Sequence, residues 1–260
     1  MHRSLSYIDP QAKLAKNVVV GPFVTVEKNV EIGSGTWIGS NVTIMEGARI
    51  GKNCEIFPGA VISAIPQDKK FSGEESLAII GDNTVIRECA TINRATQVTG
   101  KTIVGKNCLI MAYAHIAHDC VIGDNSIIVN NVALGGHVEI GEYAIIGGLT
   151  AIHQFVKIGK HSIVSGGSLV RKDVPPYVKA GREPLSFVGI NSIGLRRRNF
   201  SDKEIEEIQE IYRVLYQKNN NNTQAINKLE IDFKASIIRD EIIDFVKKSV
   251  RGIMRGYNQK

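Results

Sequence analysis

The sequence has little of what several classes of protein require. Its four cysteines include no CxxC pair, which argues against a disulfide framework and against a cysteine-ligated zinc site. No stretch of the chain approaches 18 consecutive apolar residues, so we expect no integral membrane segment. Residues 1–6 contain no apolar signal-peptide core. We therefore expect a protein of the cytoplasm.

Aromatic residues are also scarce, at 6% of the chain, and no known nucleic-acid-binding module is present. The formal net charge is +6, from 32 Lys and Arg against 26 Asp and Glu. A basic protein favours anionic partners but does not identify them. Without a binding module, we expect no nucleic acid among these partners.

What the sequence does contain is a repeat of six residues. Counting in sixes from Ile8 to Val170 gives 28 positions, of which 26 hold Ile, Leu or Val, with interruptions only at Asp68 and Glu74. The residue two places before each of these positions is small or β-branched, apart from Pro66. Three cysteines lie on this second track, namely Cys54, Cys108 and Cys120, and we expect them to be buried core residues.

Residues two apart on a strand share a face, so each hexad should place one large and one small side chain inward. Glycine and asparagine follow many of the large residues, as in Ile50-Gly51-Lys52-Asn53, and both residue types suit tight corners with positive φ. Alternating short strands and corners predict a parallel β-helix. Three hexads form one coil, so equivalent positions recur every 18 residues.

The repeat suggests a division into two domains. We expect residues 1–190 to form the β-helix, with excursions near residues 63–77 and 95–101, and residues 191–260 to form a small helical domain. Residues 181–199 are interpreted as a connector. Ser201 begins a capping box that predicts one helix, and residues 219–222 should break it. Thr223 is a candidate cap for the next helix, and apolar residues from Ile238 through Val250 to Ile253 mark a final one.

Five histidines lie in the last third of the repeat, namely His115, His118, His137, His153 and His161. None falls on either inward track, so we expect each to point outward or to occupy a corner rather than the core. The 18-residue spacing places six residues in one patch on three successive coils: His118, Asp119, Gly136, His137, His153 and Gln154. A base, a carboxylate, a free amide and an amide side chain together suggest a catalytic site, with coincidental stacking of surface histidines as the alternative.

His115 and His118 have the HxxH spacing of some zinc sites. Residues three apart on a strand point to opposite sides, and zinc needs three or four ligands. We therefore expect no metal and no cofactor.

Several longer motifs carry a resemblance to a known family: AHIAHDC, GGHVEIG, AIIGGLTAIHQF, DVPPYV and GINSIGLRRRNFS. They resemble the UDP-N-acetylglucosamine 3-O-acyltransferases of lipid A biosynthesis, and the similarity covers essentially the whole chain. The resemblance implies a mainly β fold, a left-handed parallel β-helix of hexapeptide repeats with a small C-terminal α-helical domain. It also implies a homotrimer with active sites between subunits.

The activity implied is transfer of a 3-hydroxyacyl group from acyl carrier protein to the 3-hydroxyl of UDP-N-acetylglucosamine. His118 matches the general base, Asp119 its orienting carboxylate and the Gly136 amide the oxyanion donor. Gly166 matches the position that limits acyl length, and glycine there implies room for about 14 carbons or more. The substrate-contacting positions of the family are matched by Gln67, Lys70, His115, His137, His153, Gln154, Asn191, Arg197 and Arg198.

The chain departs from the family pattern at two positions. Asn93 replaces a histidine, and Ile193 replaces an acidic residue that some members carry. These changes leave open an acceptor with a 3-amino group. Two further functions stay open, a zinc-dependent γ-type carbonic anhydrase and a sugar-nucleotide-binding module without turnover.

Overall fold

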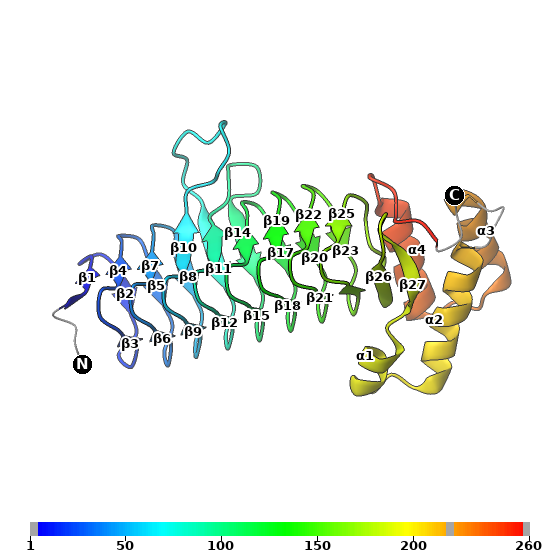
Figure 1. Cartoon of the computed structure of the whole chain (residues 1–260), viewed down its shortest axis with the longest axis horizontal. Helices are drawn as coiled ribbons and strands as arrows, with labels where there is room; N and C mark the ends of the chain where they lie inside the picture. The colour runs from blue at the N-terminus through cyan, green and yellow to red at the C-terminus, as the bar shows by residue number, and fades with distance from the viewer. Residues whose placement is uncertain (1–4, 217–220, 257–260) are drawn as a thin grey trace.

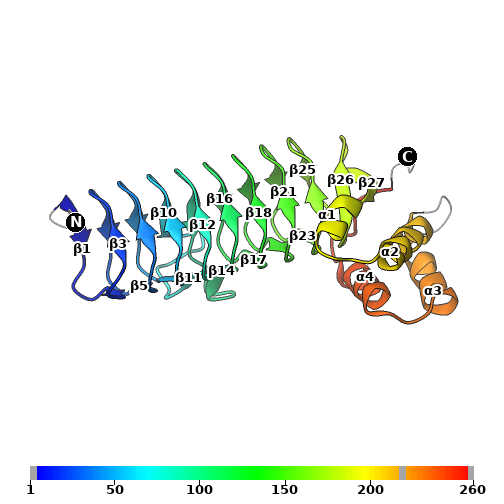
Figure 2. The ribbon, with the colours of Figure 1, turned by 90° about the horizontal axis from the view of Figure 1, so that it is seen from below.

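A computed structural model describes residues 5–216 and 221–256 of the chain. Short strands coil around a long axis and form a three-sided prism, and the helices follow at its C-terminal end (Figures 1 and 2). Each side of the prism is one sheet, and successive coils within it pair in parallel. None of the helices in these two described ranges is long and apolar enough to cross a membrane.

The three sheets are named A, B and C in the order in which the chain visits them. Sheet A contains β1 (Tyr7–Ile8), β4 (Thr25–Val26), β7 (Thr43–Ile44), β10 (Val61–Ala64), β13 (Thr91–Asn93), β16 (His115–Ile116), β19 (Ala133–Leu134), β22 (Ala151–Ile152) and β25 (Leu169–Val170). Sheet B contains β2 (Lys13–Leu14), β5 (Glu31–Ile32), β8 (Ala48–Ile50), β11 (Leu77–Ile80), β14 (Lys101–Val104), β17 (Val121–Ile122), β20 (Glu139–Ile140) and β23 (Lys157–Ile158). Sheet C contains β3 (Val19–Val20), β6 (Trp37–Ile38), β9 (Glu55–Ile56), β12 (Val85–Ile86), β15 (Leu109–Ile110), β18 (Ile127–Ile128), β21 (Ile145–Ile146), β24 (Ile163–Val164), β26 (Val178–Gly181) and the antiparallel β27 (Ser186–Ile190).

The core of the prism is built as the two tracks predict. Large residues of the repeat such as Ile38 and Ile116 are fully buried, and so are Cys54, Cys108 and Cys120 of the small track. Val98 is an exception. It keeps the count of six but is 72% exposed, because the chain has left the prism there.

The corners explain the glycine and asparagine pattern in two ways. Asparagines such as Asn53 and Asn107 have φ near +50° (52° and 53°), as predicted. The glycine two residues earlier is needed for a different reason. A Cβ added to Gly51 or Gly105 would lie within 3 Å of the backbone of the next coil, so only glycine allows the coils to stack this closely.

Two loops leave the prism, one between β10 and β11 and one between β13 and β14. Both emerge at the edge where sheet A passes into sheet B, here called the A/B edge, and both rise from the same side of the prism (Figure 1). These loops, residues 65–76 and 94–100, correspond to the excursions expected near residues 63–77 and 95–101.

Four helices follow the prism: α1 (Ser192–Arg197), α2 (Asp202–Leu215), α3 (Asn222–Asp232) and α4 (Ile237–Lys248). The Ser201 capping box is present, and α2 packs against α3 and α4. The division of the chain at residue 190 stays a prediction, because nothing here tests whether the two parts are independent domains.

Three expectations about this region were wrong. Residues 181–199 are more than a connector, since they include β27 and α1. The side chain of Asn221, not Thr223, caps α3 by accepting from the Gln224 N–H. Helix α4 ends at Lys248, so Val250 lies beyond it and is 97% exposed. The helix break expected at residues 219–222 falls partly outside the described residues.

Candidate active site

The predicted patch lies along the A/B edge, where three successive coils turn from sheet A into sheet B. The corners stack through backbone hydrogen bonds, from His137 N to His118 O (3.1 Å) and from Phe155 N to Gly136 O (3.1 Å). The 18-residue register therefore places His118, Gly136 and Gln154 at equivalent positions on neighbouring coils, as counted from the sequence.

His118 and Asp119 form the closest polar pair of the patch. Nδ1 of His118 lies 2.7 Å from Oδ2 of Asp119, and the two side chains are 12% and 0% exposed. The Asp119 carboxylate is buried at this edge, because the loop between β13 and β14 covers it. A buried carboxylate bound to Nδ1 fixes the imidazole tautomer and leaves Nε2 as the basic atom.

His137 stands next to this pair. Its Nε2 is 3.8 Å from the same oxygen of Asp119, its ring meets the ring of His118 edge-on at 5.3 Å, and it stacks on Phe155 at 4.6 Å. The patch therefore has a packed second imidazole on the coil that follows His118.

Asp119 is held by residues that sequence reasoning did not identify. Thr96 and Thr99 of the loop between β13 and β14 donate to its carboxylate from their hydroxyls and their backbone amides. The backbone N–H of Asp119 in turn donates to Oγ1 of Thr102. Burial alone would raise the pKa of Asp119. Hydrogen bonds from Thr99, His118 and Thr96 outweigh it and lower that pKa, so the carboxylate stays ionised.

Gly136 lies directly against His118. A Cβ at Gly136 would be 2.5 Å from Cε1 and 2.7 Å from Nε2 of His118, so no other residue fits without moving the ring. Among the described residues, the Gly136 amide has no backbone or side-chain acceptor. A free donor beside the basic nitrogen is the arrangement that an oxyanion site requires.

A pocket of about 480 Å³ opens in front of these residues. Six of the residues predicted from the sequence line this pocket: Gln67, His115, His118, Gly136, His153 and Gln154. Lys70 belongs to the same loop as Gln67 but is exposed and lies outside the lining.

His115 and His118 were expected to point to opposite sides of a strand, and this was wrong. His115 is the outward-facing residue of β16 and His118 occupies the corner after the strand, so both line the pocket. Burial first, and then the neighbouring His118, lower the pKa of His115, whose Nδ1 lies 2.7 Å from Oγ1 of Thr91.

The structure does not bring the remaining predicted residues to this pocket. Asn191 caps α1 and donates to the His161 carbonyl (2.8 Å), and Arg198 donates to the Tyr143 carbonyl (3.3 Å) and lies over the Tyr143 ring. His161 and Tyr143 occupy corners between sheets B and C. Arg197 is exposed on the neighbouring α1, and Gly166 is exposed at a corner between sheets C and A. The predicted site residues therefore occupy three different edges of the prism.

His161 corrects another expectation, because it is a core histidine. It is 5% exposed, stacks between Tyr143 and Tyr177, and meets Phe200 edge-on. Burial, followed by the charges of Arg198 and Lys160, lowers its pKa to about 4. The repeat indicated a corner correctly, but it could not show that Tyr177, Asn191 and Phe200 pack against that corner.

One group of residues has the spacing of a metal site. The ligand atoms of His118, Asp119 and His137 lie within 4.8 Å of one another, and two imidazoles with one carboxylate are a donor set that zinc accepts. A measurement of bound zinc in the purified protein tests this alternative directly.

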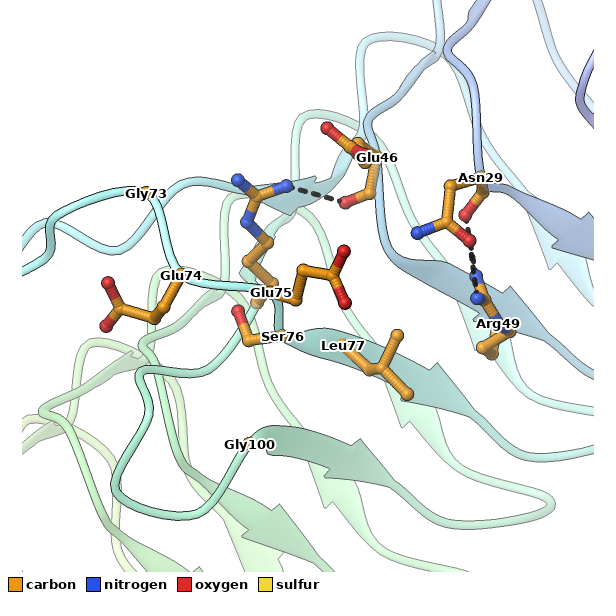
Figure 3. Close-up of a pocket in the computed structure, with 10 residues that line it drawn as sticks. Asn29, Glu46, Arg49, Gly73, Glu74, Glu75, Ser76, Leu77 and Gly100 are labelled. Atoms are coloured by element: carbon orange, nitrogen blue, oxygen red, sulfur yellow. Dashed lines mark hydrogen bonds between the residues drawn. The ribbon is translucent and has the colours of Figure 1, made fainter.

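A second pocket, of about 560 Å³, lies on the same edge toward the N-terminus (Figure 3). Its lining is dominated by charged groups, including Glu46, Glu74, Glu75, Arg49 and Arg94, and includes no histidine. Nη1 of Arg94 donates to the Glu46 carbonyl, and this hydrogen bond connects the start of the loop between β13 and β14 to the prism. This lining offers no base oriented by a carboxylate.

Comparison with known proteins decides the family. Residues 173–254 match the family described as UDP-N-acetylglucosamine O-acyltransferase, domain 2, residues 101–136 match the bacterial transferase hexapeptide family, and residues 3–106 match the GMPPB C-terminal domain. The chain is 58% identical over 254 residues to an acyl-[acyl-carrier-protein]--UDP-N-acetylglucosamine O-acyltransferase of Chlorobium phaeobacteroides, with 96% of each chain covered. The chain belongs to the UDP-N-acetylglucosamine O-acyltransferase family.

Solved structures of this family have the same fold. The UDP-N-acetylglucosamine acyltransferase of Bacteroides fragilis is 48% identical, with a TM-score of 0.95 over 98% of this chain and 100% of that one. That of Francisella novicida is 42% identical, with a TM-score of 0.95 over 98% and 94% of the two chains. The predicted fold class, a left-handed parallel β-helix with C-terminal helices, and the prediction of an acyltransferase are confirmed.

Proposed function

We propose that this protein transfers a 3-hydroxyacyl group from acyl carrier protein to the 3-hydroxyl of UDP-N-acetylglucosamine, the first step of lipid A biosynthesis. The names of the relatives support both substrates. The observation that carries the mechanism is the His118 imidazole, which a buried carboxylate orients at Nδ1 while Nε2 stays beside a free backbone amide.

His118 acts as the general base. Its Nε2 takes the proton of the acceptor hydroxyl as that oxygen attacks the thioester carbonyl, and Asp119 stabilises the resulting imidazolium. The Gly136 amide donates to the carbonyl oxygen as it becomes negative, an interaction worth about 3 kcal/mol in comparable sites. When the C–S bond breaks, the proton passes from His118 to the departing thiolate of the carrier, which leaves as the thiol, and the acyl oxygen ester remains on the sugar.

Substrate contacts come from both the pocket and the other edges of the prism. In the proposal, Gln67, Lys70, His115, His137, His153 and Gln154 contact the substrates at the A/B edge, whereas Asn191, Arg197 and Arg198 contact them from the helical end and Gly166 limits the acyl chain. One prism cannot bring its own three edges together. A homotrimer, in which the edges of neighbouring copies face each other, brings these residues to a shared groove.

Asn93 bears on the identity of the acceptor. It lines the pocket where some family members have histidine. Its Nδ2 donates to the Ile65 carbonyl, and its buried Oδ1 has no partner among the described residues. The environment of the acceptor thus differs from that of the histidine-containing relatives. A 3-amino UDP-sugar is therefore included as a competing acceptor.

One assay tests the proposal. Purified protein is incubated with 3-hydroxyacyl carrier proteins of several chain lengths and with UDP-N-acetylglucosamine or its 3-amino analogue, and the products are identified by mass spectrometry. We expect a 3-O-acylated product, with good use of chains of about 14 carbons. Tight binding of UDP-N-acetylglucosamine without product from any donor would contradict the proposal and favour a binding module. Bound zinc together with hydration of carbon dioxide would favour the carbonic anhydrase alternative.

A further inference from the structure

The loop between β13 and β14 does more than leave the prism and return. Its start is fixed by Oγ of Ser76, which donates to the Ala95 carbonyl (2.5 Å), and its turn is closed by Gly100 N donating to Thr96 O (2.9 Å). Two of its threonines are directed back to the A/B edge and reach Asp119.

The hydrogen bonds of Asp119 account for both of its oxygens. Oδ1 accepts from Thr96 N (3.3 Å), from Thr99 N (3.3 Å) and from Oγ1 of Thr99. Oδ2 accepts from Thr96 N (3.2 Å), from Oγ1 of Thr96 (2.9 Å) and from Nδ1 of His118 (2.7 Å). Because an ionised carboxylate only accepts, His118 must carry its proton at Nδ1.

We propose that Thr96 and Thr99 are positioning residues for acyl transfer, which hold the Asp119 carboxylate at the angle that keeps Nε2 of His118 free and directed at the acceptor hydroxyl. This inference rests on the proposed function, because it assigns the base to His118. The threonines touch neither substrate; they act on the base through Asp119.

The arrangement also sets how strongly Asp119 acts on His118. Each donor from the loop takes up part of the carboxylate's negative charge, so removing one leaves more of that charge for the imidazolium and makes His118 more basic. Loss of Asp119 itself has the opposite sign, because the imidazolium then has no counter-charge. A structural role alone would produce neither shift.

Other ionisable groups face this pair and bear on the interpretation. His137 lies 3.8 Å from Oδ2 of Asp119, and His115 is coupled to His118. Cys120, behind the corner, has its pKa raised to about 12 by burial and stays neutral. Glu74 accepts from the Gln97 amide on the outer side of the loop. All of these groups are unchanged in the threonine variants and in the control described below. A shift in the pH profile that the threonine variants show and the control does not therefore results from the loss of a threonine hydroxyl.

Thr99 is the better residue to change, because it lies at the surface of the loop and contributes no core packing. Thr99→Val keeps its shape and removes the hydroxyl, and Thr99→Ser restores it. Val98→Ala, at a 72% exposed position of the same loop, is the matched control. Thr96→Val removes the second hydroxyl from a buried position, so its melting temperature is measured alongside.

We expect Thr99→Val to lower kcat by about 10-fold to 100-fold, with little change in KM for the sugar nucleotide. The acidic limb of kcat/KM should move to higher pH by about half a unit or more, whereas Asp119→Asn should move any residual activity to lower pH. Thr99→Ser and Val98→Ala should behave as wild type. If Thr99→Val retains the wild-type kcat and pH profile, the inference is wrong.

A titration of the His118 ring by ¹⁵N NMR separates this inference from the proposed function. In the wild type, Nδ1 should carry the proton of the neutral ring, and Thr99→Val should raise the titration midpoint. If the protein transfers no acyl group but the midpoint still shifts, the positioning stands and the proposed reaction falls. If the wild type transfers the acyl group and the midpoint is the same in both proteins, the proposed reaction stands and the positioning role of Thr99 is wrong.

Discussion

Gly136 supports the imidazole ring of His118 from the next coil of the prism. The position of a Cβ at residue 136 would be 2.5 Å from Cε1 and 2.7 Å from Nε2 of His118, which is closer than side chains approach one another. The absence of a side chain at one corner thus allows the base on the preceding corner to lie flat against the backbone, beside the amide proposed to bind the oxyanion.

Gly136→Ala should therefore displace His118 without straining its own backbone, because φ at this corner is not positive. We expect kcat/KM to fall by about 100-fold, the loss that a displacement of about 1 Å can cause, while the oligomeric state and the melting temperature change little. Steady-state kinetics and size-exclusion chromatography measure these effects. Gly148→Ala, whose added methyl would lie 3.2 Å from its nearest neighbour, is the control. An active Gly136→Ala variant would show that His118 need not occupy this position.

The buried His161 predicts a stability change in acid. Its pKa in the folded protein, about 4, lies below the ordinary value of 6.5, so the unfolded chain binds a proton that the folded chain does not. This contribution to the free energy of unfolding is complete above pH 6.5 and is lost as the pH falls toward 4, by about 3 kcal/mol in all.

His161→Phe keeps an aromatic ring in the stack and removes the titrating group. Denaturant unfolding between pH 7 and pH 4 should show a shallower loss of stability for this variant than for wild type. His153→Gln, at an exposed corner, should follow the wild-type profile. Parallel curves for His161→Phe and wild type would mean that His161 is not the group that links stability to pH.

Asp173 joins the end of the prism to the segment after α4. Its carboxylate accepts from Lys157 N (2.8 Å) and from Oγ of Ser249 (2.6 Å), and its side chain is buried. Asp173→Ala leaves both donors without a partner and should lower the free energy of unfolding by about 2–4 kcal/mol. Asp124 accepts from Lys106 N at an exposed corner, so Asp124→Ala should lower it by less than about 1 kcal/mol. Equal losses in the two variants would remove this role from Asp173.

The sequence predicted the prism well because its information is periodic. The large and small tracks determine which residues face inward, and the period of 18 determines which corners meet. The spacing alone was therefore enough to place His118, Gly136 and Gln154 together. The left-handed coil and the family came from the longer motifs instead, because the six-residue period is the same for either hand.

Periodicity could not predict the structure of segments that depart from the repeat, such as the loops and the C-terminal helices. Thr96 and Thr99 lie in a loop whose path no period describes, and Val98 kept the count of six only by coincidence. His161 occupies a predicted corner, yet the rings of Tyr177 and Phe200 that pack against it come from beyond the repeat. The sequence likewise could not show that Arg198 and Gly166 lie at edges of the prism other than the A/B edge. That required the assignment of each corner to a pair of sheets.

The central claim is that His118, oriented by Asp119, is the general base of acyl transfer. The most direct test is kcat/KM of His118→Ala with 3-hydroxyacyl carrier protein and UDP-N-acetylglucosamine, in protein whose melting temperature and oligomeric state match the wild type. We predict a loss of at least about 100-fold, the typical contribution of a positioned base. A folded variant that transfers the acyl group at a rate near that of the wild type would contradict the account.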